Sequence, residues 1–152
     1  MNVLLSLLCL SLVVAPECSS LPKMGDSLRR SINSIISMAQ TTLVHIKNIR
    51  TGECTVVPPV EGLTNIILDL GRLDNELQSL LTEPPSQIQA DVSSLEGRAR
   101  SFAQMLGCGV PARPTKETSN NLFPDSRLQL SLMKVQCYLE KFLLNKDKLK
   151  IC

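Results

Sequence analysis

Residues 77–92 read LQSLLTEPPSQIQADV and hold the shortest link between two predicted helices. Apolar residues recur at helical spacing before and after this link, which covers residues 82–86. Two adjacent prolines end the helix before it, and Ser86-x-x-Gln89 matches a capping box that begins the helix after it. Even fully extended, the link reaches only about 17 Å, which is shorter than either helix. The two helices must therefore be antiparallel.

Four stretches of the chain carry apolar residues at alternating spacings of three and four, which places them on one face of a helix. We therefore predict an all-α chain with helices near residues 27–49, 64–81, 87–106 and 126–145. The apolar residues of the four predicted stripes are Leu28, Ile32, Ile35, Ala39, Leu43, Ile46 and Ile49; Ile66, Leu70, Leu73, Leu77 and Leu80; Ile88, Val92, Leu95, Ala99, Phe102 and Leu106; and Leu128, Leu132, Val135, Leu139, Phe142 and Leu143.

Local signals agree with these helix ends. Gly107 and Gly109 are expected to close the third helix, because glycine readily adopts the backbone conformation that ends a helix. Ser126-x-x-Gln129 matches a second capping box and is expected to begin the fourth helix.

The other two links are long. Residues 50–63 and 107–125 can each cross the full length of a helix, unlike the short link between them. Two long crossings around one short turn predict an up-up-down-down four-helix bundle of the long-chain helical cytokine type. An up-down-up-down bundle would leave both long links unexplained.

The first residues of the chain predict secretion. Residues 3–14 are almost all apolar, too few to span a bilayer but typical of a signal-peptide core. Small residues at Cys18 and Ser20 favour cleavage after Ser20, with cleavage after Ala15 as the alternative. We expect a signal peptide at 1–20, one domain at 21–152, a secreted extracellular product and no membrane insertion. The competing interpretation is that the apolar run forms a buried first helix.

Cleavage after Ser20 leaves four cysteines, Cys54, Cys108, Cys137 and Cys152. An even number in a small secreted domain indicates two disulfides, with three pairings open. We favour Cys108 with Cys152, a long closed loop for which chain-entropy models give roughly 4 kcal/mol. Cys54 and Cys137 then form the possible second pair.

Composition argues against several functions. The net charge is +2, and with no Trp, one Tyr and three Phe the chain lacks aromatic stacking positions for nucleic acid. There is no CxxC and only one histidine, His45, so no metal site is expected. No motif of a known catalytic site is present, so we expect no enzymatic activity and no cofactor. The acidic residues Asp69, Asp74 and Glu76 are expected on a solvated helix face.

The stretch VEGLTNIILDL at residues 60–70 resembles the start of the second helix of the leptin family. The likeness covers nearly the whole mature chain, and Cys108 and Cys152 occupy the places of that family's two cysteines. Cys54 and Cys137 are additional, and Leu144 stands near a tryptophan of the mammalian members, which suggests a divergent member from a non-mammalian vertebrate. Further matching segments are Leu73-Asp74, Leu77–Thr82, Pro85-Ser86 and Leu95-Glu96.

The resemblance implies a hormone that is monomeric when free and binds a class I cytokine receptor ectodomain of the leptin-receptor type. It also implies JAK/STAT signalling and a role in energy balance and appetite. The family's main receptor surface covers exposed faces of the first and third helices, and a second surface combines the first crossing with the start of the fourth helix. Carried onto this chain, the main surface comprises Ser34, Ser37, Gln40, Thr41, His45, Ala90, Gly97, Arg100 and Ser101, and the second comprises Val56, Val57, Ser126 and Arg127.

Several of these residues also have plainer interpretations. Arg100 is the preferred anchor of the main surface because arginine is enriched at binding hot spots, although it could simply be solvated. Gly97 could lie on a neutral solvated face, and Val56 and Val57 could pack onto the bundle. Two other functions stay open, namely another long-chain helical cytokine (interleukin-6-like or growth-hormone-like) and a secreted helical lipid carrier. A lipid carrier needs an apolar cavity or helices that open, whereas continuous apolar stripes favour a closed core.

Overall fold

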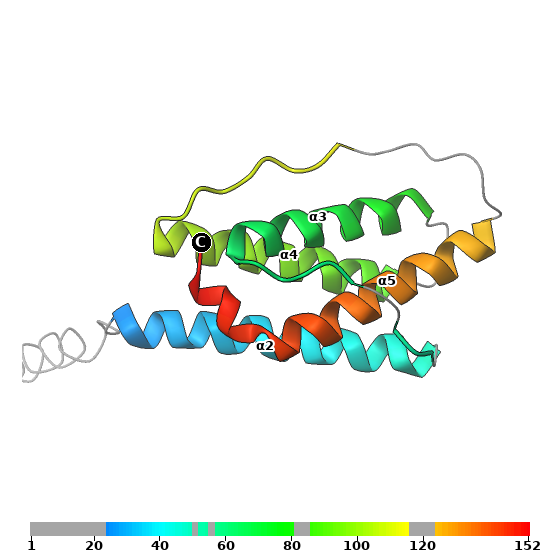
Figure 1. The fold of residues 1–152 in the computed structure, drawn as a ribbon, viewed down its shortest axis with the longest axis horizontal. Coiled ribbons are helices and arrows are strands. Elements are labelled where there is room, and N and C mark those ends of the chain that lie inside the picture. The colour runs from blue at the N-terminus through cyan, green and yellow to red at the C-terminus, as the bar shows by residue number, and fades with distance from the viewer. Residues whose placement is uncertain (1–23, 50–51, 55–56, 81–85, 116–123) are drawn as a thin grey trace, which may run out of the picture. The chain divides into compact units, whose positions relative to one another are not determined.

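The computed structural model describes residues 24–49, 52–54, 57–80, 86–115 and 124–152. These residues form four α-helices, α2 (Met24–Ile49), α3 (Leu63–Leu80), α4 (Ser86–Leu106) and α5 (Pro124–Leu144), followed by the short 3₁₀ helix η1 (Lys146–Lys150) (Figure 1). The described part of the chain contains no strand, so the all-α prediction is confirmed. The expected signal peptide at 1–20 lies outside the described residues.

The chain divides into two compact units, Met1–Arg30 and Ser31–Cys152. In the first unit the structure describes the opening turns of α2, from Met24 onward. The second unit contains the rest of α2 and all the other helices, and the architecture below is that of this unit.

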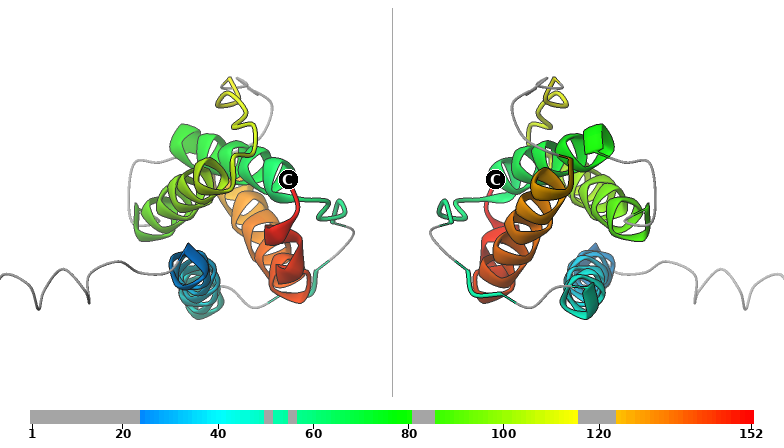
Figure 2. Two further views of the ribbon diagram at one scale, coloured as in Figure 1. Left: turned by 90° about the vertical axis from the view of Figure 1, so that its left-hand side faces the viewer. Right: turned by 90° about the vertical axis from the view of Figure 1, so that its right-hand side faces the viewer.

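Within the second unit, α2 and α3 run in one direction while α4 and α5 run in the opposite one (Figures 1 and 2). This is the up-up-down-down order that the lengths of the links predicted. The antiparallel pair α3 and α4 packs closely, and α5 lies against α3. The two parallel pairs are joined by the long crossings, of which residues 107–115 return along α3 (Figure 1).

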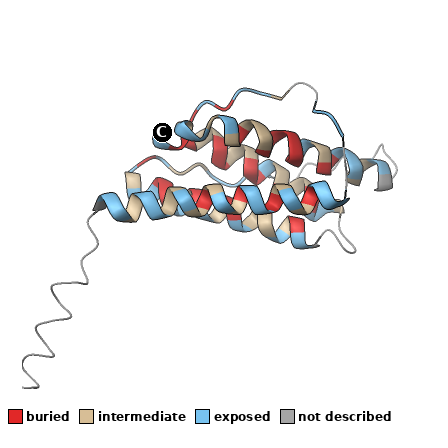
Figure 3. Ribbon diagram, turned by 90° about the horizontal axis from the view of Figure 1, so that it is seen from below, coloured by how far each residue is buried: buried red, intermediate tan, exposed pale blue. Residues whose placement is uncertain are grey.

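The predicted apolar stripes form the core. Buried and exposed positions alternate along the helices with the expected period (Figure 3). Ile49 is an exception, with 57% of its surface exposed, because it is the last residue of α2. The fully or almost fully buried members of the stripes are Ile35, Ala39, Ile46, Ile66, Leu70, Leu77, Ile88, Val92, Leu95, Ala99, Phe102, Leu132, Val135, Leu139 and Phe142.

Gly107 ends α4 as predicted. Its φ of 73° lies in the left-handed region that glycine enters without a steric penalty. Its N–H donates to Gln104 O at 3.1 Å, and the next N–H, from Cys108, donates to Ala103 O at 2.9 Å. This pair of bonds is a Schellman motif, which satisfies carbonyls that the helix leaves free at its end. Gly109 lies beyond the motif and does not close the helix.

The start of α5 differs from the prediction. The helix begins at Pro124, two residues before the expected start at Ser126. Proline suits the first turn of a helix, because its φ is already helical and the N–H it lacks would have no partner there. Ser126 therefore lies inside the first turn and does not cap the helix.

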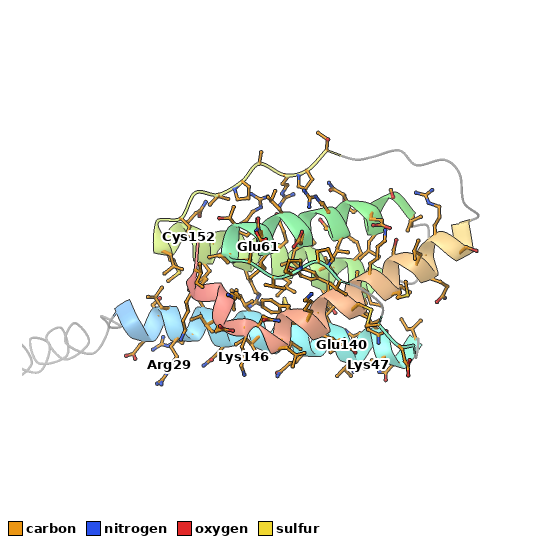
Figure 4. All side chains as sticks on the ribbon, viewed as in Figure 1. Arg29, Lys47, Glu61, Glu140, Lys146 and Cys152 are labelled. Atoms are coloured by element: carbon orange, nitrogen blue, oxygen red, sulfur yellow. A yellow bond between two sulfur atoms is a disulfide. The ribbon has the colours of Figure 1, made fainter. Side chains whose placement is uncertain are left out.

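The last residues return to the start of α3. The N–H of Leu63 donates to Ile151 O at 2.6 Å, and that of Thr64 approaches Cys152 O at 3.4 Å (Figure 4). These contacts satisfy N–H groups that the first turn of α3 leaves free. A Cβ on Gly62 would lie 3.0 Å from Ile151 O, so a glycine permits the approach.

Two disulfides fasten this arrangement. Cys108 is joined to Cys152, with 5.6 Å between their Cα atoms, and Cys54 to Cys137, with 5.3 Å. These are the two pairs expected from the sequence. The first ties the C-terminal residues to the end of α4, and the second ties the first crossing to the middle of α5.

Candidate functional site

The main surface expected from the sequence contains a shallow hollow between α2 and α4, with a volume of about 210 Å³. Three of its lining residues, Ser34, Ser37 and Thr41, were nominated from the sequence and lie on successive turns of α2. The others are Met38 on α2 and Asp91 and Arg98 on α4, none of which the sequence analysis nominated. The hollow therefore combines short polar side chains with one acidic and one basic group.

His45 joins the two helices beside this hollow. Its Nδ1 lies 2.6 Å from Asp91 Oδ2, and the His45 and Asp91 side chains are 37% and 13% exposed. The second carboxylate oxygen of Asp91 accepts a hydrogen bond of 2.7 Å from Gln87 Nε2. Both oxygens of Asp91 thus have a donor, and the group is held in place.

Arg98 reaches across from α4 to α2. Its Nη1 donates to Ser34 Oγ, while the residue itself stays exposed. Within the described ranges no carboxylate pairs with Arg98. The guanidinium therefore lines the hollow, held by the bond to Ser34 and not engaged in an ion pair with any described residue.

The remaining nominated residues extend the same surface. Gln40, Ala90 and Ser101 are exposed, and Gly97 is half-buried. A Cβ built on Gly97 would meet no atom within 4 Å, so the surface beside it is open. Ala90, Gly97 and Ser101 are spaced seven and four residues apart, which puts them on one face of α4.

Arg100 does not lie on the exposed face where the sequence analysis placed it. Its side chain is 16% exposed and pairs through Nε with the Glu96 carboxylate, which is 2% exposed. Its Nη1 also donates to Pro111 O at 2.5 Å. Arg100 therefore fastens the second crossing to α4. Successive residues turn by about 100° around a helix, so Arg98 and Arg100 point in nearly opposite directions.

The second expected surface is not assembled as proposed. Val57 is half-buried, and its carbonyl accepts a hydrogen bond of 2.6 Å from Lys141 Nζ. Lys141 lies nearly four helical turns after Arg127, about 21 Å along α5 at the usual rise per residue. The structure therefore separates Val57 from Ser126, which is exposed, and from Arg127, which is half-buried. Val56 lies outside the described residues.

Val57 instead borders a groove of about 450 Å³ between α3, α5 and the first crossing. Two ion pairs flank the groove, Arg72 with Asp69 at 3.4 Å and Lys134 with Glu76 at 3.0 Å. Its apolar lining comes from Val57, Pro58, Leu73, Leu130, Met133, Cys137 and the ring of Tyr138.

Burial alters two ionisable groups in this groove. It raises the pKa of Asp69, against the opposing effect of the Arg72 guanidinium. It also raises the pKa of Tyr138, and the neighbouring Asp69 charge adds to that rise. The Tyr138 hydroxyl faces Asp69, but within the described residues it makes no hydrogen bond of standard geometry.

Asp74 is not solvated as expected. It is 5% exposed, and its two carboxylate oxygens accept hydrogen bonds from Gln78 at 3.0 Å and Gln89 at 3.2 Å. Burial raises its pKa, and the two amide donors partly oppose that effect. Asp74 thus belongs to the packing between α3 and α4.

Two further features were searched for in the part of the chain that the structure describes. No cluster of three or more histidine, cysteine or acidic side chains is arranged to bind a metal ion. Likewise, none of the described helices combines the length and the apolar character needed to cross a membrane.

No protein-family model matches the chain, and no solved structure is significantly similar to it. A curated protein does match, Leptin-B of Oryzias latipes. It is 41% identical over 155 residues, an alignment that covers 97% of this chain and 98% of that protein. The chain belongs to the leptin family. This membership confirms the resemblance inferred from the second helix and the cysteines, and it agrees with the helical bundle, the disulfides and a hormone of the leptin type.

Proposed function

We propose that the chain is a secreted hormone that binds and activates a class I cytokine receptor of the leptin-receptor type. Binding triggers JAK/STAT signalling, with roles in energy balance and appetite. The protein has no catalytic activity of its own and acts by holding receptor ectodomains in one geometry. Membership of the leptin family supports this function, and the surface between α2 and α4 supplies the contact.

The observation that carries the proposal is the gathering of nominated residues around one hollow. Ser34, Ser37 and Thr41 line the hollow, and His45 contacts Asp91, which also lines it. Gly97 precedes Arg98 and has open space at its Cβ position. Short side chains allow a partner's backbone to come close, and the hollow can receive a protruding side chain. We define this set, together with Gln40, Ala90 and Ser101, as the α2–α4 face.

The groove between α3 and α5 lies on the other side of the second unit (Figure 2). Its apolar centre between two ion pairs has the anatomy of a protein interface, with an apolar middle and a polar rim. We assign it the second receptor contact, in place of a surface built on Ser126 and Arg127. Contacts on opposite sides let one hormone hold two ectodomains, because the second binding step then occurs at high local concentration.

The test replaces Gly97 with arginine. The new side chain starts in open space and projects from the α2–α4 face, so it blocks a docked partner. The fold is retained, because replacing a helical glycine by a good helix former stabilises a helix by about 1 kcal/mol. Gly109→Arg is the matched control, because Gly109 is exposed beyond the end of α4 and a Cβ there would also meet no atom within 4 Å.

We expect Gly97→Arg to weaken binding to a leptin-receptor-type ectodomain about 100-fold, because changes at the centre of an interface cause the largest losses of affinity. STAT reporter activity in cells carrying that receptor should fall in parallel. Gly109→Arg should behave like the unmodified protein in both assays. Unchanged binding by Gly97→Arg would remove the α2–α4 face from the contact. A folded hormone that is silent on this receptor but active through another class I receptor would identify a different helical cytokine.

A further inference from the structure

Arg98 uses little of its capacity to donate hydrogen bonds. A guanidinium carries five N–H donors, and within the described residues the only acceptor bonded to this one is Ser34 Oγ. Ser34 is neutral, so the bond positions the group without cancelling its charge. Most of the donors remain open to a partner that covers the hollow.

The neighbouring acidic group is in the opposite condition. Asp91 accepts from His45 at 2.6 Å through one carboxylate oxygen and from Gln87 at 2.7 Å through the other. It is only 13% exposed, so it has little left to offer a basic partner. The hydrogen-bonding capacity that remains in the hollow is therefore mainly that of the Arg98 guanidinium, which is a donor.

The side chains around Arg98 allow a close approach. Gly97 precedes it with open space at its Cβ position, and Ser37 lies across the hollow on α2. The Thr41 hydroxyl donates to Ser37 O at 3.0 Å, so its hydrogen is already used by its own helix. A partner side chain that reaches this point meets the guanidinium as the main free donor.

We infer that the receptor surface which docks on the α2–α4 face presents a carboxylate to Arg98. The inference rests on the proposed function and names the chemistry of its partner. A carboxylate can accept two parallel bonds from a guanidinium, the strongest pairing open to this group. Ser34 already holds the group in place, so less freedom is lost on binding. A basic partner would leave two cations facing each other, which is unfavourable.

The experiment measures the affinity of Arg98 variants for a leptin-receptor-type ectodomain by surface plasmon resonance. We expect Arg98→Gln to lose about tenfold or more, since removing one partner of a covered charge pair is costly. Arg98→Lys should retain part of the affinity, because it keeps the charge but cannot form the two-bond contact. Arg98→Glu should lose the most, through direct repulsion.

Salt dependence adds a readout that a purely packing role would not change. Binding of the unmodified protein should weaken as the sodium chloride concentration rises, because salt screens the attraction between Arg98 and the carboxylate. Binding of Arg98→Gln should weaken less, because this variant lacks that attraction. Lys146→Gln is the control, since it removes the same charge from an exposed position on η1. Melting curves should show that all variants stay folded, because Arg98 is an exposed residue.

A rescue identifies the partner group directly. Reversing the acidic residues of the ectodomain to lysine, one at a time, should yield one receptor variant that restores binding to Arg98→Glu. The inference is overturned if Arg98→Gln binds like the unmodified protein while Gly97→Arg abolishes binding, since the face would then be correct and the carboxylate wrong. Tighter binding by Arg98→Glu would overturn it as well, by indicating a basic partner. Normal binding by Gly97→Arg would overturn the proposed face, and this inference with it.

Discussion

The two long crossings are fastened to the bundle by different chemistry. The first is held to α5 by the Cys54–Cys137 disulfide and by hydrogen bonds to the carbonyls of Gly52 and Val57. The second is held by charged and amide side chains. Arg100 donates to the Pro111 carbonyl and Asn75 donates to Pro114 O at 2.5 Å; Arg113 approaches Glu96 at 3.5 Å.

This difference decides which crossing could be recognised in advance. Cysteines can be recognised in the sequence as candidates for a covalent link, and four of them allow only three pairings. The second crossing depends on Glu96, an ordinary helical glutamate whose burial cannot be inferred from its spacing. A Cβ on Gly71 would lie 3.0 Å from Pro114, so the crossing also runs close to α3 at a glycine. The disulfide of the first crossing therefore stabilises the fold mainly by restricting the unfolded chain. The second crossing instead depends on a buried charge pair in the folded protein.

Glu96→Ala should break the second crossing most strongly. It leaves the Arg100 guanidinium, 16% exposed, without its carboxylate. Removing one member of a buried pair costs about 4 kcal/mol, because the remaining charge stays buried without compensation. Urea denaturation followed by circular dichroism measures the free energy of unfolding.

Arg113→Gln is the matched control for this prediction. Arg113 contacts the same carboxylate but is 68% exposed, so its loss should cost less than about 1 kcal/mol. Equal, small effects of both changes would mean that the buried pair does not fasten the second crossing.

Removing the first crossing's disulfide should have the next largest effect. Cys54→Ser combined with Cys137→Ala opens a loop of 83 residues, and disulfides typically stabilise by about 3 kcal/mol. Alanine suits position 137 because Cys137 is buried, whereas position 54 is exposed. The free energy of unfolding should fall, and hydrogen exchange should speed up in residues 52–54 and 57–60.

The same exchange experiment separates the two crossings. Residues 107–115 should keep their protection in the cysteine variant, because their contacts with α3 and α4 are untouched. Equal loss of protection in both crossings would show that they open together, which contradicts the two separate fastenings.

The architecture could be read from the sequence because it depends on spacing and length. Helical periodicity fixed the stripes, since only a face repeated every three or four residues can be buried continuously. The short link at residues 82–86 requires α3 and α4 to be antiparallel. The two long links can each cross the length of a helix, so they allow the helices that they join to be parallel. η1 escaped prediction because its five residues are too few for a periodic signal, although its Leu149 is fully buried.

The functional surface was only partly predictable. Arg98 and Arg100 are two residues apart in sequence, and their side chains point about 200° apart around α4. Which of them is covered depends on the path of the second crossing, and a link of that length has many paths. The sequence analysis nominated Arg100, whereas the structure leaves Arg98 exposed. In the same way, the separation of Val57 from Arg127 follows from where the first crossing meets α5.

Asp74→Asn should have the smallest effect on stability. It tests how the buried Asp74 carboxylate contributes to stability at different pH values. Burial raises the pKa of Asp74 above its value in the unfolded chain, about 3.9. At a pH between these two values the folded protein binds more protons, so stability rises as the pH falls through the folded pKa. The unmodified protein should therefore gain stability relative to Asp74→Asn on going from pH 7 toward pH 4. Melting temperatures of both proteins at several pH values measure this difference. A difference that stays constant, or that shrinks in acid, would mean that the Asp74 carboxylate is stabilised in its ionised form by Gln78, Gln89 and Arg113.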